Sequence, residues 1–206
     1  MDEPGTARLE TFSDGVFAIA ATLLVLEIGV GEPLRHALGR ELLDLWPSYL
    51  AYVTSFLTIG IIWVNHHAVF ELIARADRTL LFVNTVFLLV VAFIPFPTKL
   101  VAEFLREGGE DERTAVLAYG CTLTLMAILY GLLWFYAAVG RRLIAPAAPQ
   151  ERVDEISRSF APGSFLYAGA TGLAFASPVA SVLVTLGLAV FYVPSTWLRR
   201  RREPRA

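Results

Sequence analysis

The apolar run between Arg8 and Val30 constrains the fold more than any other part of the sequence. It opens with a cation and a short polar patch at Ser13 and Asp14, and then continues mostly with apolar residues as far as Glu27. A helix needs about 20 such residues to cross the hydrocarbon core of a bilayer. An aspartate inside a membrane-spanning helix is costly unless it is paired. We therefore expect the rest of the chain to supply partners for Asp14.

The composition predicts an all-α integral membrane protein. Of the 206 residues, 56% are hydrophobic and only 17% are charged, whereas a soluble domain carries about 25% charged residues. Continuous apolar runs do not suit the alternating strands of a membrane β-barrel. The sequence predicts one six-helix bundle over residues 1–206, with spans at about 10–30, 45–70, 79–105, 113–140, 160–177 and 179–198.

The basic residues predict the orientation of the chain in the membrane. With both termini in the cytoplasm, most of the 17 Lys and Arg residues fall in loops on the cytoplasmic side, as the positive-inside rule requires. The N-terminal tail is short and acidic and lacks the basic region of a cleavable signal peptide. The expected location is the plasma membrane, as a multi-pass protein. The expected surroundings are the lipid bilayer and further copies of the chain, with no nucleic acid.

Three of the predicted helices carry polar residues at one depth, near the cytoplasmic face. They are Ser13 and Asp14 on the first helix, Trp63, His66 and His67 on the second, and Asn84 on the third. The simplest interpretation is that these side chains hydrogen-bond to one another and fix the packing of the helices. Proton sensing by a histidine is an alternative. A metal site is a weaker alternative, because adjacent histidines on a helix point about 100° apart.

The first helix has an apolar stripe on the side away from Asp14. At about 100° per residue from Ile19, Leu23 lies at about 40°, Leu26 at about −20° and Thr22 at about −60°, whereas Asp14 lies about 140° away. Helical phase alone leaves lipid contact, core packing and a pore wall open as roles for this stripe.

Motifs on the first three predicted helices are more specific than the composition. They are Arg8-x-x-x-Phe12-Ser13-Asp14 on the first helix, Trp63-Val64-Asn65-His66-His67 on the second, and Asn84 with Pro95-Phe96-Pro97-Thr98 on the third. Together they resemble the transmembrane protein 175 family of potassium channels, whose first helix opens with R-x-x-x-F-S-D. The resemblance covers the six-span layout and the whole chain length.

The resemblance implies a potassium-selective cation channel in which the first helix of each subunit lines the central pore of a homotetramer. Ile19 would form the narrowest ring, Leu23 and Leu26 the next layers outward, and Thr22 a ring of hydroxyls close to Ile19. The sequence has no TVGYG-like loop for a carbonyl filter. Potassium would be the permeant ion, with no cofactor and no other metal.

Two further roles follow from the resemblance and from position. The residues Arg8, Phe12, Ser13 and Asp14 would form a packing anchor bonded to the polar residues of the second and third helices. Glu27 lies near the outer end of the first helix, where copies around the mouth of a pore would concentrate cations. The alternative for Glu27 is an interfacial glutamate that simply faces water.

Two other functions compete with a channel. A proton-coupled secondary transporter would use Asp14 and His66 or His67 as a relay, but neither discontinuous helices nor an internal repeat is evident. An intramembrane enzyme would need a nucleophile and a base, for which Ser13, Asp14 and His67 are the only candidates. Asp14 directly follows Ser13 and points elsewhere on a helix, so we expect no enzymatic activity.

Overall fold

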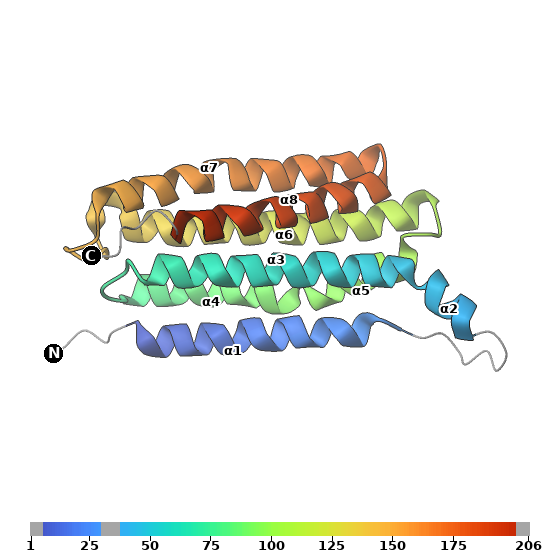
Figure 1. The fold of residues 1–206 in the computed structure, drawn as a ribbon, viewed down its shortest axis with the longest axis horizontal. Helices are drawn as coiled ribbons and strands as arrows, with labels where there is room; N and C mark the ends of the chain where they lie inside the picture. The colour runs from blue at the N-terminus through green and yellow to red at the C-terminus, as the bar shows by residue number, and fades with distance from the viewer. Residues whose placement is uncertain (1–5, 30–37, 201–206) are drawn as a thin grey trace.

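The computed structural model describes residues 6–29 and 38–200 of the chain, which form a bundle of helices (Figure 1). The predicted end of the first span at residue 30 lies outside the described residues. The elements are α1 Ala7–Leu23, η1 Leu24–Glu27, α2 Leu38–Asp44, α3 Trp46–Phe70, α4 Arg78–Phe93, α5 Pro95–Phe104, α6 Gly109–Ala138, η2 Val139–Arg141, α7 Gln150–Gly172, η3 Leu173–Phe175 and α8 Pro178–Arg200.

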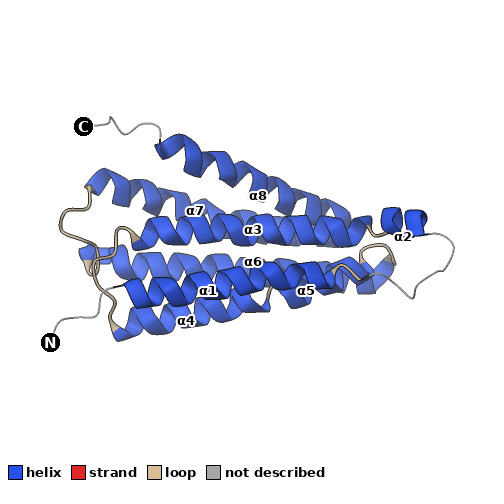
Figure 2. Ribbon diagram, turned by 60° about the horizontal axis from the view of Figure 1, so that its bottom comes forward, coloured by secondary structure: helices blue, strands red, loops and turns tan. Residues whose placement is uncertain are grey.

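Helix α1 lies on one side of the bundle, α3 with α4 and α5 in the middle, and α6, α7 and α8 on the far side (Figure 1). In Figure 2 the molecule is turned so that α1 comes forward, and α1 then lies between α3 on one flank and α4–α5 on the other. We call the end where α1 begins the basal end; the turns at 71–77 and 139–149 lie there too (Figure 1). Among the helices that the structure describes, none covers the outer side of α1.

Four helical stretches are long and apolar enough to cross a membrane, namely Ala7–Glu27, Trp46–Phe70, Arg78–Phe104 and Gly109–Arg141. Within the described residues the apolar part of α8 is shorter, Pro178–Phe191. Helix α7 begins at Gln150 rather than near residue 160, because charged residues that favour helix extend it at its start. These findings identify a multi-span helical membrane protein.

The predicted third span is divided into α4 and α5 at Ile94. Pro95 has no N–H to donate to the carbonyl of Val91, and the N–H of Ile94 donates to that carbonyl instead, at 3.2 Å. The local tightening leaves Ile94 fully buried and lets α5 continue from α4. The same stretch therefore spans the bundle in two segments.

Helices α6 and α7 approach each other closely at Gly120. A side chain at this position would collide with Thr171 of α7, so only glycine fits. The hydroxyl of Thr171 lies 3.2 Å from that of Thr124 on α6. A close approach of small and hydroxyl residues is the usual way in which membrane helices pack.

The two turns at the basal end are clasped together. Ile73 and Ile144, both buried, form an isolated antiparallel bridge, with hydrogen bonds of 2.9 Å from Ala74 N–H to the carbonyl of Leu143 and from Ala145 N–H to that of Leu72. The clasp fixes the start of α4 against the end of α6.

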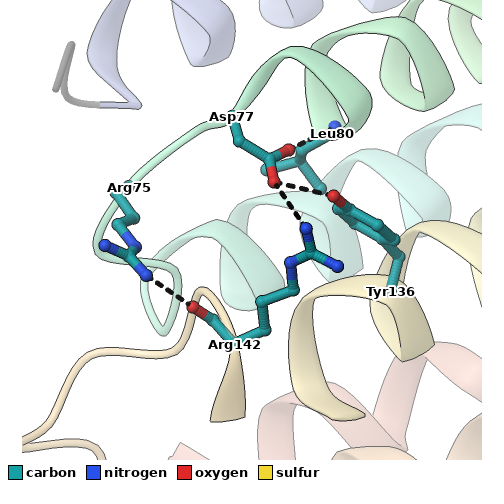
Figure 3. Close-up of polar contacts among 5 residues, drawn as sticks. All are labelled: Arg75, Asp77, Leu80, Tyr136 and Arg142. Carbon is teal, nitrogen blue, oxygen red and sulfur yellow. Dashed lines mark hydrogen bonds and ion pairs between the residues drawn. The ribbon is translucent and has the colours of Figure 1, made fainter. Parts of the chain in front are cut away.

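Asp77 is the polar centre of the clasp (Figure 3). Its carboxylate caps α4 by accepting the N–H of Leu80 at 2.8 Å, accepts the hydroxyl of Tyr136 at 2.7 Å, and pairs with Arg142 at 3.8 Å. Arg75 donates to the backbone carbonyl of Arg142 at 3.1 Å. Burial alone would raise the pKa of Asp77, but these hydrogen bonds and the Arg142 charge together lower it.

We expect Asp77→Ala to lower the free energy of unfolding by about 1–2 kcal/mol, because α4 loses its N-cap. Because the fold lowers the pKa of Asp77, its contribution is complete above the ordinary value of 3.8 and is lost as the pH falls through the lowered value. Denaturant unfolding of the purified protein measures both effects. Glu103→Ala is the matched control, because Glu103 forms an exposed ion pair with Lys99 of its own helix. Equal losses in the two variants would contradict a specific role for Asp77.

Candidate functional site

The predicted pore residues lie on the uncovered side of α1. Ile19 is 61% exposed, Leu23 41% and Leu26 71%, and Thr22 is exposed as well. The opposite side of the helix is buried, as shown by Phe17 at 2%. Within the described residues, this apolar membrane-spanning surface therefore has no cover.

The outer end of this surface is a tighter helix than the sequence suggested. From Leu24 to Glu27 the chain forms the 3₁₀ helix η1, in which residues three apart eclipse each other. Leu26 therefore lies closer to the line of Leu23 than a regular α-helix would place it. Leu24 anchors this segment because its side chain is fully buried, in a segment that contacts α3 and α5. Glu27, at the end of η1, is half-buried.

Thr22 places a hydroxyl at the level of Ile19. Its Oγ1 donates to the backbone carbonyl of Ile19 at 2.9 Å, which is the usual local bond for a threonine within a helix. The donated proton leaves the oxygen lone pairs of Thr22 available as acceptors. The apolar surface of α1 thus includes one polar acceptor next to its most exposed isoleucine.

Three buried side chains join α1, α3 and α4 on the inner side of α1. Asn84 donates through Nδ2 to Ser13 Oγ at 3.0 Å, and Ser13 donates to the carbonyl of Leu9 at 2.8 Å. His66 Nε2 lies 3.0 Å from Asn84 Oδ1. An amide oxygen only accepts, so the proton of His66 is assigned to Nε2. Exposure is 0% for Ser13, 1% for His66 and 0% for Asn84.

Aromatic rings surround the buried histidine. The ring of His66 stacks on Phe70 with centroids 4.4 Å apart, and Phe17 of α1 meets it edge-on at 5.4 Å. Phe87 of α4 lies nearly parallel to it with centroids 5.9 Å apart. The rings exclude water, so the hydrogen bonds of His66 and Asn84 lie in a low-dielectric environment where leaving one unmade is costly.

A second polar contact lies at the surface. Trp63 Nε1 donates to Asp14 Oδ1 at 2.8 Å, and both side chains are exposed, with Trp63 at 44%. The carboxylate of Asp14 is thus held on the flank of α1 that adjoins α3. It does not reach His66, so Ser13 and Asp14 contact α3 and α4 by separate routes.

The remaining motif residues stay outside this cluster. Arg8 and Phe12 are exposed, Phe12 at 58%. His67 also points away and pairs with Glu71 at 3.5 Å, with 51% of its side chain exposed. The structure therefore brings together the motif residues Ser13, Asp14, Trp63, His66 and Asn84, and leaves Arg8, Phe12 and His67 at the surface.

The sequence analysis missed a second buried polar network in the other half of the bundle. Ser55 Oγ lies 2.8 Å from Thr98 Oγ1 and donates to the Tyr119 hydroxyl at 2.9 Å. The network joins α3, α5 and α6. Hydroxyl residues inside otherwise apolar runs could have indicated this network, because hydroxyl groups within a membrane need hydrogen-bond partners.

The described part of the chain contains no group of three or more His, Cys, Asp or Glu residues placed to hold a metal ion. The polar clusters are hydrogen-bonded pairs and triads that connect helices. Their chemistry is that of helix packing, and the surface left uncovered beside them is apolar.

Comparison with known proteins shows which family combines these features. The family model described as "Endosomal/lysosomal potassium channel TMEM175" matches residues 8–95. A potassium channel of Chamaesiphon minutus is 43% identical over 194 residues, which cover 93% of this chain and 95% of that protein. A potassium channel of Streptomyces collinus is 45% identical over 199 residues, covering 93% and 92%.

A solved structure shares the fold. The crystal structure of a lysosomal potassium-selective channel TMEM175 homolog from Chamaesiphon minutus superposes with a TM-score of 0.83 at 42% identity, covering 93% of this chain and 97% of that chain. The sequence identity extends over nearly the whole length of both proteins. The chain therefore belongs to the TMEM175 family of potassium channels.

Proposed function

We propose that this protein is a potassium-selective cation channel whose pore is lined by the exposed face of α1 in a homotetramer. The observation that carries the proposal is the uncovered apolar surface of Ile19, Leu23 and Leu26 on a membrane-spanning helix. The relatives that match this chain over nearly their whole length are named potassium channels. Packing within the core does not explain an apolar surface that is exposed on the subunit, whereas the wall of a pore does.

The selectivity of such a pore comes from dehydration. Rotational symmetry turns each residue of α1 into a ring, and a narrow ring of Ile19 strips part of the hydration shell from a passing ion. Potassium holds its hydration shell less tightly than sodium does, so the free-energy cost of partial dehydration at the ring is lower for potassium. The constriction offers few oxygen ligands, so selectivity is modest, and the pore closes when the ring dewets.

Two polar groups lie along the pore, one at the level of the ring and one at the outer mouth. Thr22, whose hydroxyl is bonded to the carbonyl of Ile19, gives a ring of acceptors at the narrowest level. Glu27 at the outer mouth concentrates cations before they enter. Neither group is a cofactor site, and potassium is the only ion that the pore is proposed to hold, in transit.

The buried cluster holds the pore helix in place. Asn84 bonds to Ser13 on α1 and to His66 on α3, so one side chain sets the positions of two helices relative to α4. Asp14 adds a bond to Trp63 on the flank. We assign these residues to anchoring, with the path of the ion on the other side of α1.

The proposed chain crosses the plasma membrane six times, with both termini in the cytoplasm. The basal turns then lie on the cytoplasmic side, where the basic residues Arg75, Arg141, Arg142 and Arg152 gather. This distribution agrees with the positive-inside rule. A channel of this kind performs no covalent chemistry.

The transporter alternative requires a relay of titratable groups. Asp14 is held by Trp63, which does not titrate, and His66 by Asn84. His67 pairs with Glu71 away from both. The described contacts thus link these groups to helix neighbours rather than to one another, which favours the channel.

Purified protein in planar bilayers under opposed potassium and sodium gradients tests the proposal. We expect single-channel currents whose reversal potential is displaced from zero toward the potassium equilibrium potential. Currents that follow the proton or sodium gradient, or flux that saturates at transporter rates, would contradict it.

We expect Ile19→Asn to raise unitary conductance several-fold and to bring the potassium-to-sodium permeability ratio toward unity, because amide groups hydrate the ring. Single-channel recording under bi-ionic conditions measures both quantities. Phe165→Asn is the matched control, since Phe165 is 80% exposed on α7, far from α1. Unchanged conductance in Ile19→Asn would mean that this face of α1 is not the pore wall.

We expect Asn84→Ala to destabilise the subunit by about 1–3 kcal/mol, because Ser13 and His66 lose a buried partner. Thr85→Ala is the neighbouring control, as Thr85 is exposed and bonds only within its own helix, to Leu81. Thermal unfolding followed by size-exclusion chromatography should show loss of assembled protein for Asn84→Ala alone. If both variants assembled normally, the cluster would not anchor α1.

A further inference from the structure

Helix α3 carries an exposed stripe along its whole length. Its exposed residues follow one another at alternating intervals of three and four, the spacing of a helix–helix seam. They are Trp46, Tyr49, Val53, Phe56, Trp63 and His67, with the half-buried Gly60 at the remaining position. A seam of this kind fits another helix packed along it.

Beside the stripe lies a group that lipid does not solvate. The exposed carboxylate of Asp14 is bonded to Trp63 of the stripe at 2.8 Å, within two membrane-spanning helices. A charged side chain in contact with hydrocarbon is costly, so such groups face protein or water. The flank where α1 meets α3 is therefore a surface that requires a cover other than lipid.

A second exposed stripe belongs to the helices on the other flank of α1. It runs along α4 and α5 with similar spacing, through Phe82 at 69%, Leu89 at 69%, Phe93 at 49% and Phe96 at 54% exposed. Figure 2 shows α1 between the two flanks. The helices on the two sides of the proposed pore helix thus each carry an exposed, mostly apolar stripe.

We propose that the α3 stripe of one subunit docks on the α4–α5 stripe of the next copy of the chain. The inference rests on the proposed function, in which α1 faces the axis of the tetramer. Rotation about that axis makes every contact heterologous, so the α3 side of each subunit meets the α4–α5 side of its neighbour. The same contact covers Asp14 and continues the surface that surrounds the pore.

The hydrogen bonds between helices fix the register of this contact. His66 pairs with Asn84 and Ser55 with Thr98, so these pairs mark two depths in the bundle. Neighbouring subunits related by rotation keep the same depth. Phe56, next to Ser55, is then level with Phe96, and Gly60, midway between the two pairs, is level with Phe93.

Cysteine cross-linking tests the contact in the full-length protein. The native Cys121 is exposed, so Cys121→Ser is the background for all variants. In membranes treated with copper–phenanthroline, we expect Phe56→Cys combined with Phe96→Cys to give a ladder of covalent dimers, trimers and tetramers on non-reducing gels. Gly60→Cys with Phe93→Cys is an independent second pair, and a Cβ at Gly60 meets nothing within 4 Å.

Controls separate this contact from other arrangements. Each single cysteine should stay monomeric on the gel, because a heterologous contact never brings a residue against its own copy. Phe165→Cys with Phe96→Cys should give no ladder, since α7 lies on the far side of the subunit. A ladder from the second pair alone supports the same contact.

Two results would overturn the proposal. Single cysteines that form dimers would show a contact between identical surfaces. The absence of a ladder from both pairs, in protein that still conducts potassium in bilayers, would leave the channel intact and place lipid or another helix on these stripes. If neither cysteine pair gave a ladder and the wild-type protein did not conduct potassium either, the proposed function itself would fail with the contact.

Discussion

The position of the first helix depends on a single buried amide. Asn84 donates to Ser13 and accepts from His66, with no solvent exposure, so α1, α3 and α4 meet at one side chain. In a membrane the apolar faces of helices gain little from meeting each other rather than lipid, and polar contacts contribute more to which helices pair. The aromatic rings around His66 keep water away and make this contact specific. The exposed side of α1 is free to face a pore because its other side is fixed.

The clasp at the basal end extends this arrangement. Asp77 begins α4 and is bonded to Tyr136 at the end of α6, and α4 then carries Asn84 against α1. The chain of contacts therefore runs from the basal turns to the proposed pore helix through one helix.

Much of the site could be predicted from the sequence because helix depth can be counted. That count placed Ser13, His66 and Asn84 at one level. It could not choose between His66 and His67, because adjacent residues differ only in the direction set by tertiary packing. The 3₁₀ segment at Leu24 was missed for a similar reason, since burial of that side chain against α3 and α5 decides the local winding. The Ser55 network and the role of Asp77 depend on contacts between distant segments, which no local pattern encodes.

The central claim is that ions pass along the exposed face of α1 and not along its buried face. Block of potassium current by silver ions at introduced cysteines, on the Cys121→Ser background, tests it most directly. The account predicts rapid block of Leu23→Cys, which is 41% exposed, and no block of Ala20→Cys, which is 2% exposed. Block of Ala20→Cys without block of Leu23→Cys would contradict it.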